Sequence, residues 1–156
     1  MDVDATGFSL AGSFSVSPKI AINVLYGSAD YDRVGGLDID SSDLGFGITA
    51  HTPIATNTDV FAGFMLVKGE FEVSGSFGSG SEDDNGNAIA LGLRHMATDS
   101  TEIEVGFTRL DIFDETTNSF DIGARFYASD KFSIGIGYGT GDDVDAFLID
   151  GRIDIK

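Results

Sequence analysis

The chain has 156 residues with 26 acidic and 9 basic side chains, a formal net charge of -17, and no Cys. The charge excludes nucleic acid as an expected partner, because phosphate binding depends on clustered Lys and Arg. The lack of Cys excludes disulfides, thiol catalysis and thiolate metal sites, and the length fits a single domain over residues 1–156.

Glycine and aromatic content favours strands over helices: the chain holds 21 Gly and 13 Phe but only 2 Pro. No segment shows the apolar recurrence of a helix, and every apolar run falls short of the roughly 20 residues of a spanning helix. Alternating apolar and polar residues instead predict nine strands. In chain order these are Phe8–Val16, Ile20–Tyr31, Leu44–Thr52, Asp59–Glu72, Asn87–Met96, Glu102–Phe113, Phe120–Ala128, Phe132–Gly139 and Val144–Ile155.

The connections between these strands alternate in length. Short turns are expected at Ser17–Lys19, Ala55–Thr58, Thr98–Thr101 and Ser129–Lys131. Longer or more acidic loops are expected at Asp32–Asp43, Val73–Gly86, Asp114–Ser119 and Gly141–Asp143. Tight turns at one end and long loops at the other are typical of outer-membrane barrels.

The two faces of the strands differ in side-chain volume. Phe46 and Ile134, for example, are large and apolar, whereas Gly47 and Gly135 on the opposite face are small. A soluble barrel would show water a face of long charged chains, but small side chains suit the concave interior of a narrow barrel with large apolar groups toward lipid. We therefore expect an all-β, antiparallel, up-and-down transmembrane β-barrel of about eight to ten strands. The alternative is a soluble, lipocalin-like ligand-binding barrel, which would fold without detergent.

Charged residues within the strands fall on the small or polar face. They are Arg94, Glu102, Glu104, Asp121, Arg125, Asp150 and Arg152. Because isolated charges are costly in a lumen with little water, we expect an Arg-carboxylate network that fills it. The strand Asp59–Glu72 is apolar on both faces: Phe64 and Leu66 lie on one, Phe61 and Val67 on the other. The sequence therefore does not predict which of the two faces meets lipid.

Four stretches carry a resemblance to the small outer-membrane β-barrels of Gram-negative bacteria, the group with the membrane domain of outer membrane protein A and its porin-like relatives. They are Gly7–Ser13, Ser28–Asp32, Ala90–Met96 and Ile136–Asp143. The resemblance implies a location in the cell outer membrane, with lipid as the surrounding partner, and a structural, adhesive or narrow-pore role. Such barrels have an even strand number, so we expect that a first strand, which relatives would supply before these nine, is missing from this chain.

Candidate chemistry is sparse. Acidic residues of the predicted outer loops could gather oxygen ligands for divalent cations or meet a partner protein, although solvated loops are the simpler interpretation. They are Asp38, Asp40 and Asp43, with Glu82, Asp83 and Asp84. His51 and His95 are expected on opposite faces, so no two-His metal site is expected. The Gly-rich Ser74–Ser81 is expected to be a flexible loop, because it lacks a following Lys-Ser/Thr. No Ser has a recognisable nucleophile context, so neither an enzyme nor a cofactor is expected.

Overall fold

The computed structural model describes residues 5–34, 36–76, 78–141 and 145–155. They form nine strands, and none of them belongs to a helix that is long and apolar enough to cross a membrane. The strands are β1 (Ala5–Ser17), β2 (Ile20–Val34), β3 (Leu37–Ala55), β4 (Thr58–Gly75), β5 (Gly78–Thr98), β6 (Thr101–Ile112), β7 (Glu115–Ser129), β8 (Phe132–Gly141) and β9 (Asp145–Ile155). The predicted all-β fold with nine strands is confirmed.

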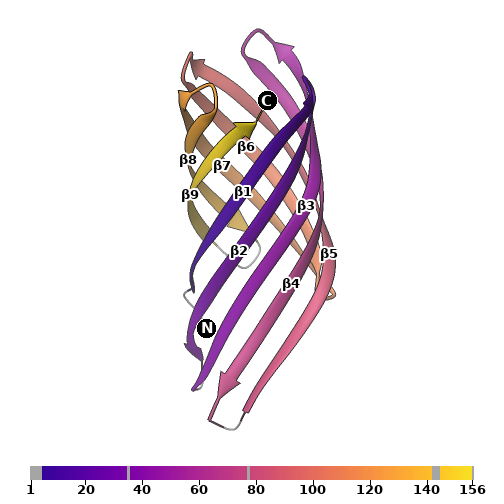
Figure 1. Cartoon of the computed structure of the whole chain (residues 1–156), viewed down its shortest axis with the longest axis vertical. Helices are drawn as coiled ribbons and strands as arrows, with labels where there is room; N and C mark the ends of the chain where they lie inside the picture. The colour runs from indigo at the N-terminus through magenta and orange to yellow at the C-terminus, as the bar shows by residue number, and fades with distance from the viewer. Residues whose placement is uncertain (1–4, 35, 77, 142–144, 156) are drawn as a thin grey trace.

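The strands form a nearly closed ring in which each pairs antiparallel with the next along the chain (Figure 1). The ring closes where β1 meets β9, and these two strands run parallel. Within the described residues their ladder consists of two pairs, Ser13 with Asp154 and Phe14 with Ile155. Nine strands, rather than an even number, therefore make the ring in the part of the chain that the structure describes.

Tight two-residue turns join the strands at one end of the barrel, as the sequence predicts. They lie at residues 18–19, 56–57, 99–100 and 130–131. Three of them follow a Ser or Thr whose hydroxyl accepts a backbone N–H two residues later, namely Ser17, Thr98 and Ser129, each at 3.3 Å. Such side chains offer the backbone a local partner, and this favours a sharp reversal.

The prediction of long acidic loops at the other end is wrong. Most of Asp32–Asp43, Val73–Gly86 and Asp114–Ser119 continues the strands, and Ser74–Ser81 likewise belongs mainly to β4 and β5. Of Gly141–Asp143, the last two residues lie outside the described part. Gly, Ser and Asp suggest turns when read locally, but here they pair in unbroken register, as Ser42 with Glu70 and Glu70 with Asp83. Cross-strand pairing thus overrides the weak strand propensity of these residues.

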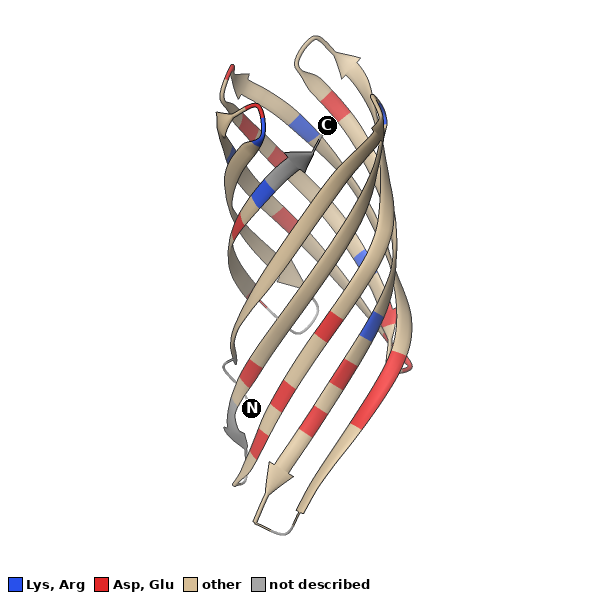
Figure 2. Cartoon of the chain, viewed as in Figure 1, with Lys and Arg blue, Asp and Glu red and all other residues tan. Residues whose placement is uncertain are grey.

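The strand extensions make one side of the barrel taller than the other. β3, β4 and β5 have 19, 18 and 21 residues, whereas β6, β8 and β9 have 12, 10 and 11. Figure 1 shows β2 to β5 reaching beyond the rest at the end opposite the tight turns. Acidic positions gather on this projecting part, as Figure 2 shows.

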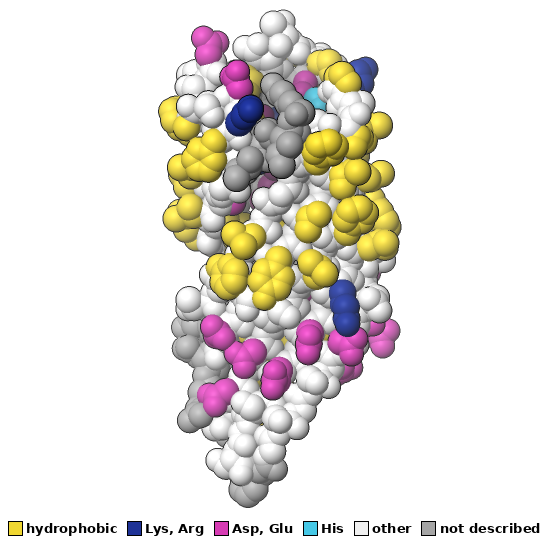
Figure 3. Space-filling view, viewed as in Figure 1, with side chains coloured by type: hydrophobic (Ala, Val, Ile, Leu, Met, Phe, Trp, Pro, Cys, Tyr) yellow, Lys and Arg dark blue, Asp and Glu magenta, His cyan; other side chains and the backbone are white. Residues whose placement is uncertain are grey.

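The outer surface is apolar over much of the barrel. Among the described residues, two large hydrophobic side chains are buried and thirty are exposed. Phe46, Phe126 and Ile134 are 58%, 54% and 45% exposed. On the face shown in Figure 3, hydrophobic side chains cover the body of the barrel, with a belt of acidic groups below them. A soluble barrel would have the opposite distribution, because its large apolar face forms the core.

The orientation of β4, which the sequence leaves open, is settled by exposure. Phe64 and Leu66 are exposed on the outside, whereas Phe61 and Val67 are buried on the inside. Across the ladder, Phe64 pairs with Ile48 and Leu66 pairs with Phe46, and both partners also point outward. The second apolar face of β4 therefore packs within the barrel.

Candidate functional site

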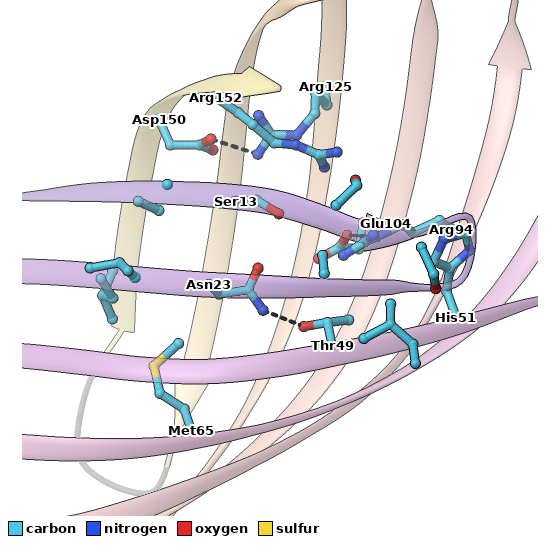
Figure 4. Close-up of a pocket in the computed structure, with 18 residues that line it drawn as sticks. Ser13, Asn23, Thr49, His51, Met65, Arg94, Glu104, Arg125, Asp150 and Arg152 are labelled. Atoms are coloured by element: carbon cyan, nitrogen blue, oxygen red, sulfur yellow. Dashed lines mark hydrogen bonds and ion pairs between the residues drawn. The ribbon is translucent and has the colours of Figure 1, made fainter. Parts of the chain in front are cut away.

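The lumen is the candidate site, because it collects the polar side chains of the strands. Two cavities lie within it, of about 310 Å³ and about 410 Å³. Glu104, Arg125 and Asp150 line both, so these three residues mark the boundary between the two. Figure 4 shows the smaller cavity, with polar side chains from β1, β2 and β3 facing those of β5, β6, β7 and β9.

Arg125 and Asp150 form an ion pair across β8. Arg125 Nη2 donates to Asp150 Oδ1 at 2.5 Å, and Nη1 donates to Ser133 Oγ at 3.3 Å. Gly135 lies between the two strands, and a Cβ there would fall 2.3 Å from Asp150 Oδ2 and 3.0 Å from Arg125 Nη2. A glycine at this register position therefore leaves room for the pair to close.

Arg94 and Glu104 form a second ion pair between β5 and β6. Arg94 Nε donates to Glu104 Oε2 at 2.6 Å, and the guanidinium carbon lies 4.4 Å from the centre of the Phe61 ring. The ring fits against Gly92, where a Cβ would fall 2.4 Å from Phe61 Cζ. The cation is thus held by a carboxylate on one side and an aromatic face on the other.

The other predicted lumen residues are placed differently. Glu102 is buried and accepts a hydrogen bond from Tyr127 Oη at 3.2 Å. Arg152 lines the smaller cavity. Asp121 lines the larger one and has no ion pair among the described residues. Its carboxylate lies against Gly106, where a Cβ would fall 2.6 Å from Oδ1.

Some polar lumen contacts are not foreseen from the sequence. Asn23 Nδ2 donates to Thr49 Oγ1 at 2.8 Å, and His51 Nδ1 lies 3.0 Å from Asp59 Oδ2. Ser133 is fully buried beside Arg125. The alternation places these residues on the inner face, but only the register between strands shows which ones meet.

Glycines create the larger cavity. Gly123, Gly137 and Gly139 line it, and a Cβ on any of them would meet only backbone atoms of the neighbouring strand, at 3.2 Å or more. No side chain from elsewhere fills the space over these glycines, whereas Gly92 and Gly135 are covered by Phe61 and by the Arg125 pair. The cavity therefore exists because β7 and β8 carry no side-chain bulk at these three inner-face positions.

The turn between β6 and β7 folds over the inner wall at the far mouth of the lumen. Phe113 and Asp114 have φ of 54° and 59°, the backbone conformation of a two-residue hairpin turn. Phe113 N donates to Asp84 Oδ2 at 2.7 Å, and a Cβ on Gly69 would fall 2.9 Å from the Phe113 ring. This contact narrows the mouth opposite the tight turns.

The acidic residues considered for cation binding are not brought together. In β3, Asp38 and Asp40 share the outer face, and Asp43 lies on the inner one. In β5, Asp83 lies on the outer face, and its neighbours Glu82 and Asp84 lie on the inner one. Among the described residues, no group of three or more His, Asp or Glu side chains is arranged to hold a metal. His51 faces the lumen and His95 is exposed beside Thr58, at 2.9 Å from its hydroxyl.

No protein-family model matches the sequence, and no curated protein matches it. Among solved structures, the chain is similar to the "CymD monoaromatic hydrocarbon channel", with a TM-score of 0.41 and 15% sequence identity. The similarity covers 86% of this chain and 46% of that one, so the chain spans less than half the length of the channel.

Proposed function

We propose that the chain is an outer-membrane β-barrel whose lumen is a narrow, ion-paired passage for small solutes. The observation that carries this proposal is the inverted distribution of side chains: thirty large hydrophobic side chains are exposed on the described residues, most of them on the outward face of their strands, while the arginine-carboxylate pairs lie inside. A strand can cross a bilayer only if its backbone groups are paired, and a ring of strands provides that pairing.

A membrane setting accounts for the exposed apolar surface. In water, an apolar area of this extent would drive association, because monomeric soluble proteins rarely expose large apolar patches. In a bilayer the same surface meets acyl chains, and the acidic belt on β2 to β5 lies beyond it in the aqueous phase (Figure 3). The tight turns then lie on the periplasmic side and the strand extensions on the outside, as in bacterial barrels of this kind.

The passage is narrow because ion pairs divide it. Arg125 with Asp150 and Arg94 with Glu104 project into the lumen where the two cavities meet. The cavities of about 310 Å³ and 410 Å³ have room for water, ions and small molecules, and the ion pairs between them restrict the route. The proposal gives these side chains a structural and conducting role and no catalytic one.

Two measurements test the proposal on the same preparation. Refolded into detergent and run unheated on a gel, the chain should migrate faster than after boiling. Incorporated in a planar bilayer, it should then pass small, discrete currents. Folding to a monomer in detergent-free buffer would contradict the membrane barrel, and a folded barrel that passes no current would contradict the passage.

A further inference from the structure

The charges on the inner face are separated along the lumen. Three arginines face inward in the described residues, Arg94, Arg125 and Arg152; Arg94 forms an ion pair with Glu104, and Arg125 forms one with Asp150. Toward the far mouth the described inner face carries acidic residues, among them Asp43, Glu82, Asp84 and Asp121, but no Lys or Arg. The basic residues at that depth, Lys68 and Arg109, lie on the outer face.

Asp43 lies on the inner wall between glycines. Its Oδ2 is 3.7 Å from the position of a Cβ on Gly27, and its Oδ1 is 3.3 Å from that on Gly69. The three residues are aligned by the ladders of β2, β3 and β4. No ion pair within the described residues involves Asp43. Its carboxylate is thus bordered by glycines on both neighbouring strands and lies at the far mouth of the lumen, where Ile112 and Phe113 also reach Gly69.

Asp121 presents a second uncompensated carboxylate, closer to the constriction. It lies on β7 two residues before Gly123, the ladder partner of Glu104, and it lines the larger cavity together with several glycines. Glu104 is engaged by Arg94, so the charge of Glu104 is offset while that of Asp121 is not. An ion that leaves or approaches the constriction therefore passes a carboxylate that has no cationic partner in the described chain.

We propose that the passage prefers small monovalent cations over anions, and that Asp43 and Asp121 set this preference. The inference rests on the proposed passage and names its solute class. Walls of low dielectric constant strengthen the field of charges that line a narrow lumen, and rings or rows of carboxylates favour cations in pores. The paired arginines contribute little opposing field, because each lies beside a carboxylate.

The experiment measures the reversal potential of the channel in a planar bilayer between unequal KCl solutions. The unaltered chain should show a potential of the sign expected for K⁺ preference. Asp43→Asn with Asp121→Asn should lower the K⁺ to Cl⁻ permeability ratio by about fivefold for each carboxylate, the attraction of a monovalent ion about 4 Å from a unit charge in water. Asp83→Asn, which removes an exposed outer carboxylate, serves as the control and should leave the ratio unchanged.

The outcomes separate the two proposals. Replacing an aspartate carboxylate with an asparagine amide preserves the shape of the side chain, and the gel shift on boiling shows whether each variant folds. A current without cation preference, or a ratio that the double variant leaves unchanged, would overturn this inference alone. A correctly folded barrel that carries no current would overturn the proposed passage, and this inference with it.

Discussion

Arg125 and Asp150 meet across a glycine: they lie on β7 and β9, and the strand between them offers Gly135 at the same level of the ladder. The pair spans the inner face of three strands, so it ties them together and narrows the lumen at one point. Its two side chains are 20% and 32% exposed, which leaves them only partly hydrated. Removing either partner should therefore have a measurable cost.

Asp150→Asn leaves Arg125 facing a neutral amide in a partly dehydrated site. We expect a loss of about 1–3 kcal/mol in the free energy of unfolding. Arg125→Gln combined with Asp150→Asn should lose less than the sum of the two single variants, because neither charge is then left alone. The measurement is urea unfolding in lipid vesicles, followed by the gel shift. Additive losses would show that the two residues do not interact.

Gly92→Ala places a methyl group against Phe61 Cζ, at a separation of 2.4 Å before relaxation. The ring must move and loosen its contact with Arg94, so we expect a loss of about 1–3 kcal/mol in the free energy of unfolding. Gly12→Ala is the matched control, since nothing lies within 4 Å of its added carbon. Equal stability of the two variants would argue against the packing of Phe61 inside the barrel.

Gly139→Val fills part of the larger cavity. The nearest atom to a Cβ at this position is Phe120 O at 3.8 Å, an ordinary contact. Conductance should therefore fall, while the free energy of unfolding stays within about 1 kcal/mol of its original value. Gly151→Val adds the same side chain on the outer face and should leave conductance unchanged. The same conductance in both variants would place the ion route elsewhere.

The strand extension carries a pH-sensitive contact. Asp40 has a raised pKa, chiefly because it is hydrogen-bonded to Asp30 on the neighbouring strand, and Glu72 lies beside it in the ladder. Between the ordinary carboxyl pKa and this raised one, the folded extension binds more protons than the unfolded chain. Its stability therefore falls as pH rises through that window and is greatest below it.

Hydrogen exchange of the backbone amides of Ala29 and Ser41, corrected for intrinsic rates, measures this effect. Exchange should quicken as pH rises through the window in the unaltered chain. In Asp30→Asn the hydrogen-bonding carboxyl and its charge are lost, so most of the dependence should disappear. An identical pH profile in that variant would show that the Asp30 contact does not control the extension.

Much of the fold follows from the sequence because strand alternation is a local signal. All nine strands, the tight turns and the orientation of residues such as Phe126 and Arg125 can be read from a period of two. The extensions cannot, because Asp38 and Gly80 disfavour strands locally and are held by partners across the ladder. For the same reason, which arginine meets which carboxylate depends on register, and the sequence does not reveal it.

In the proposed barrel, the large apolar face of each strand meets lipid and the small face meets the aqueous lumen. Spin labels on single cysteines at successive positions from Leu44 to Thr49 test it directly, since the chain has no Cys of its own. In reconstituted vesicles, collisions with oxygen should peak at Leu44, Phe46 and Ile48, where side chains point outward. The intervening positions should be shielded from oxygen, and the opposite alternation would contradict the claim.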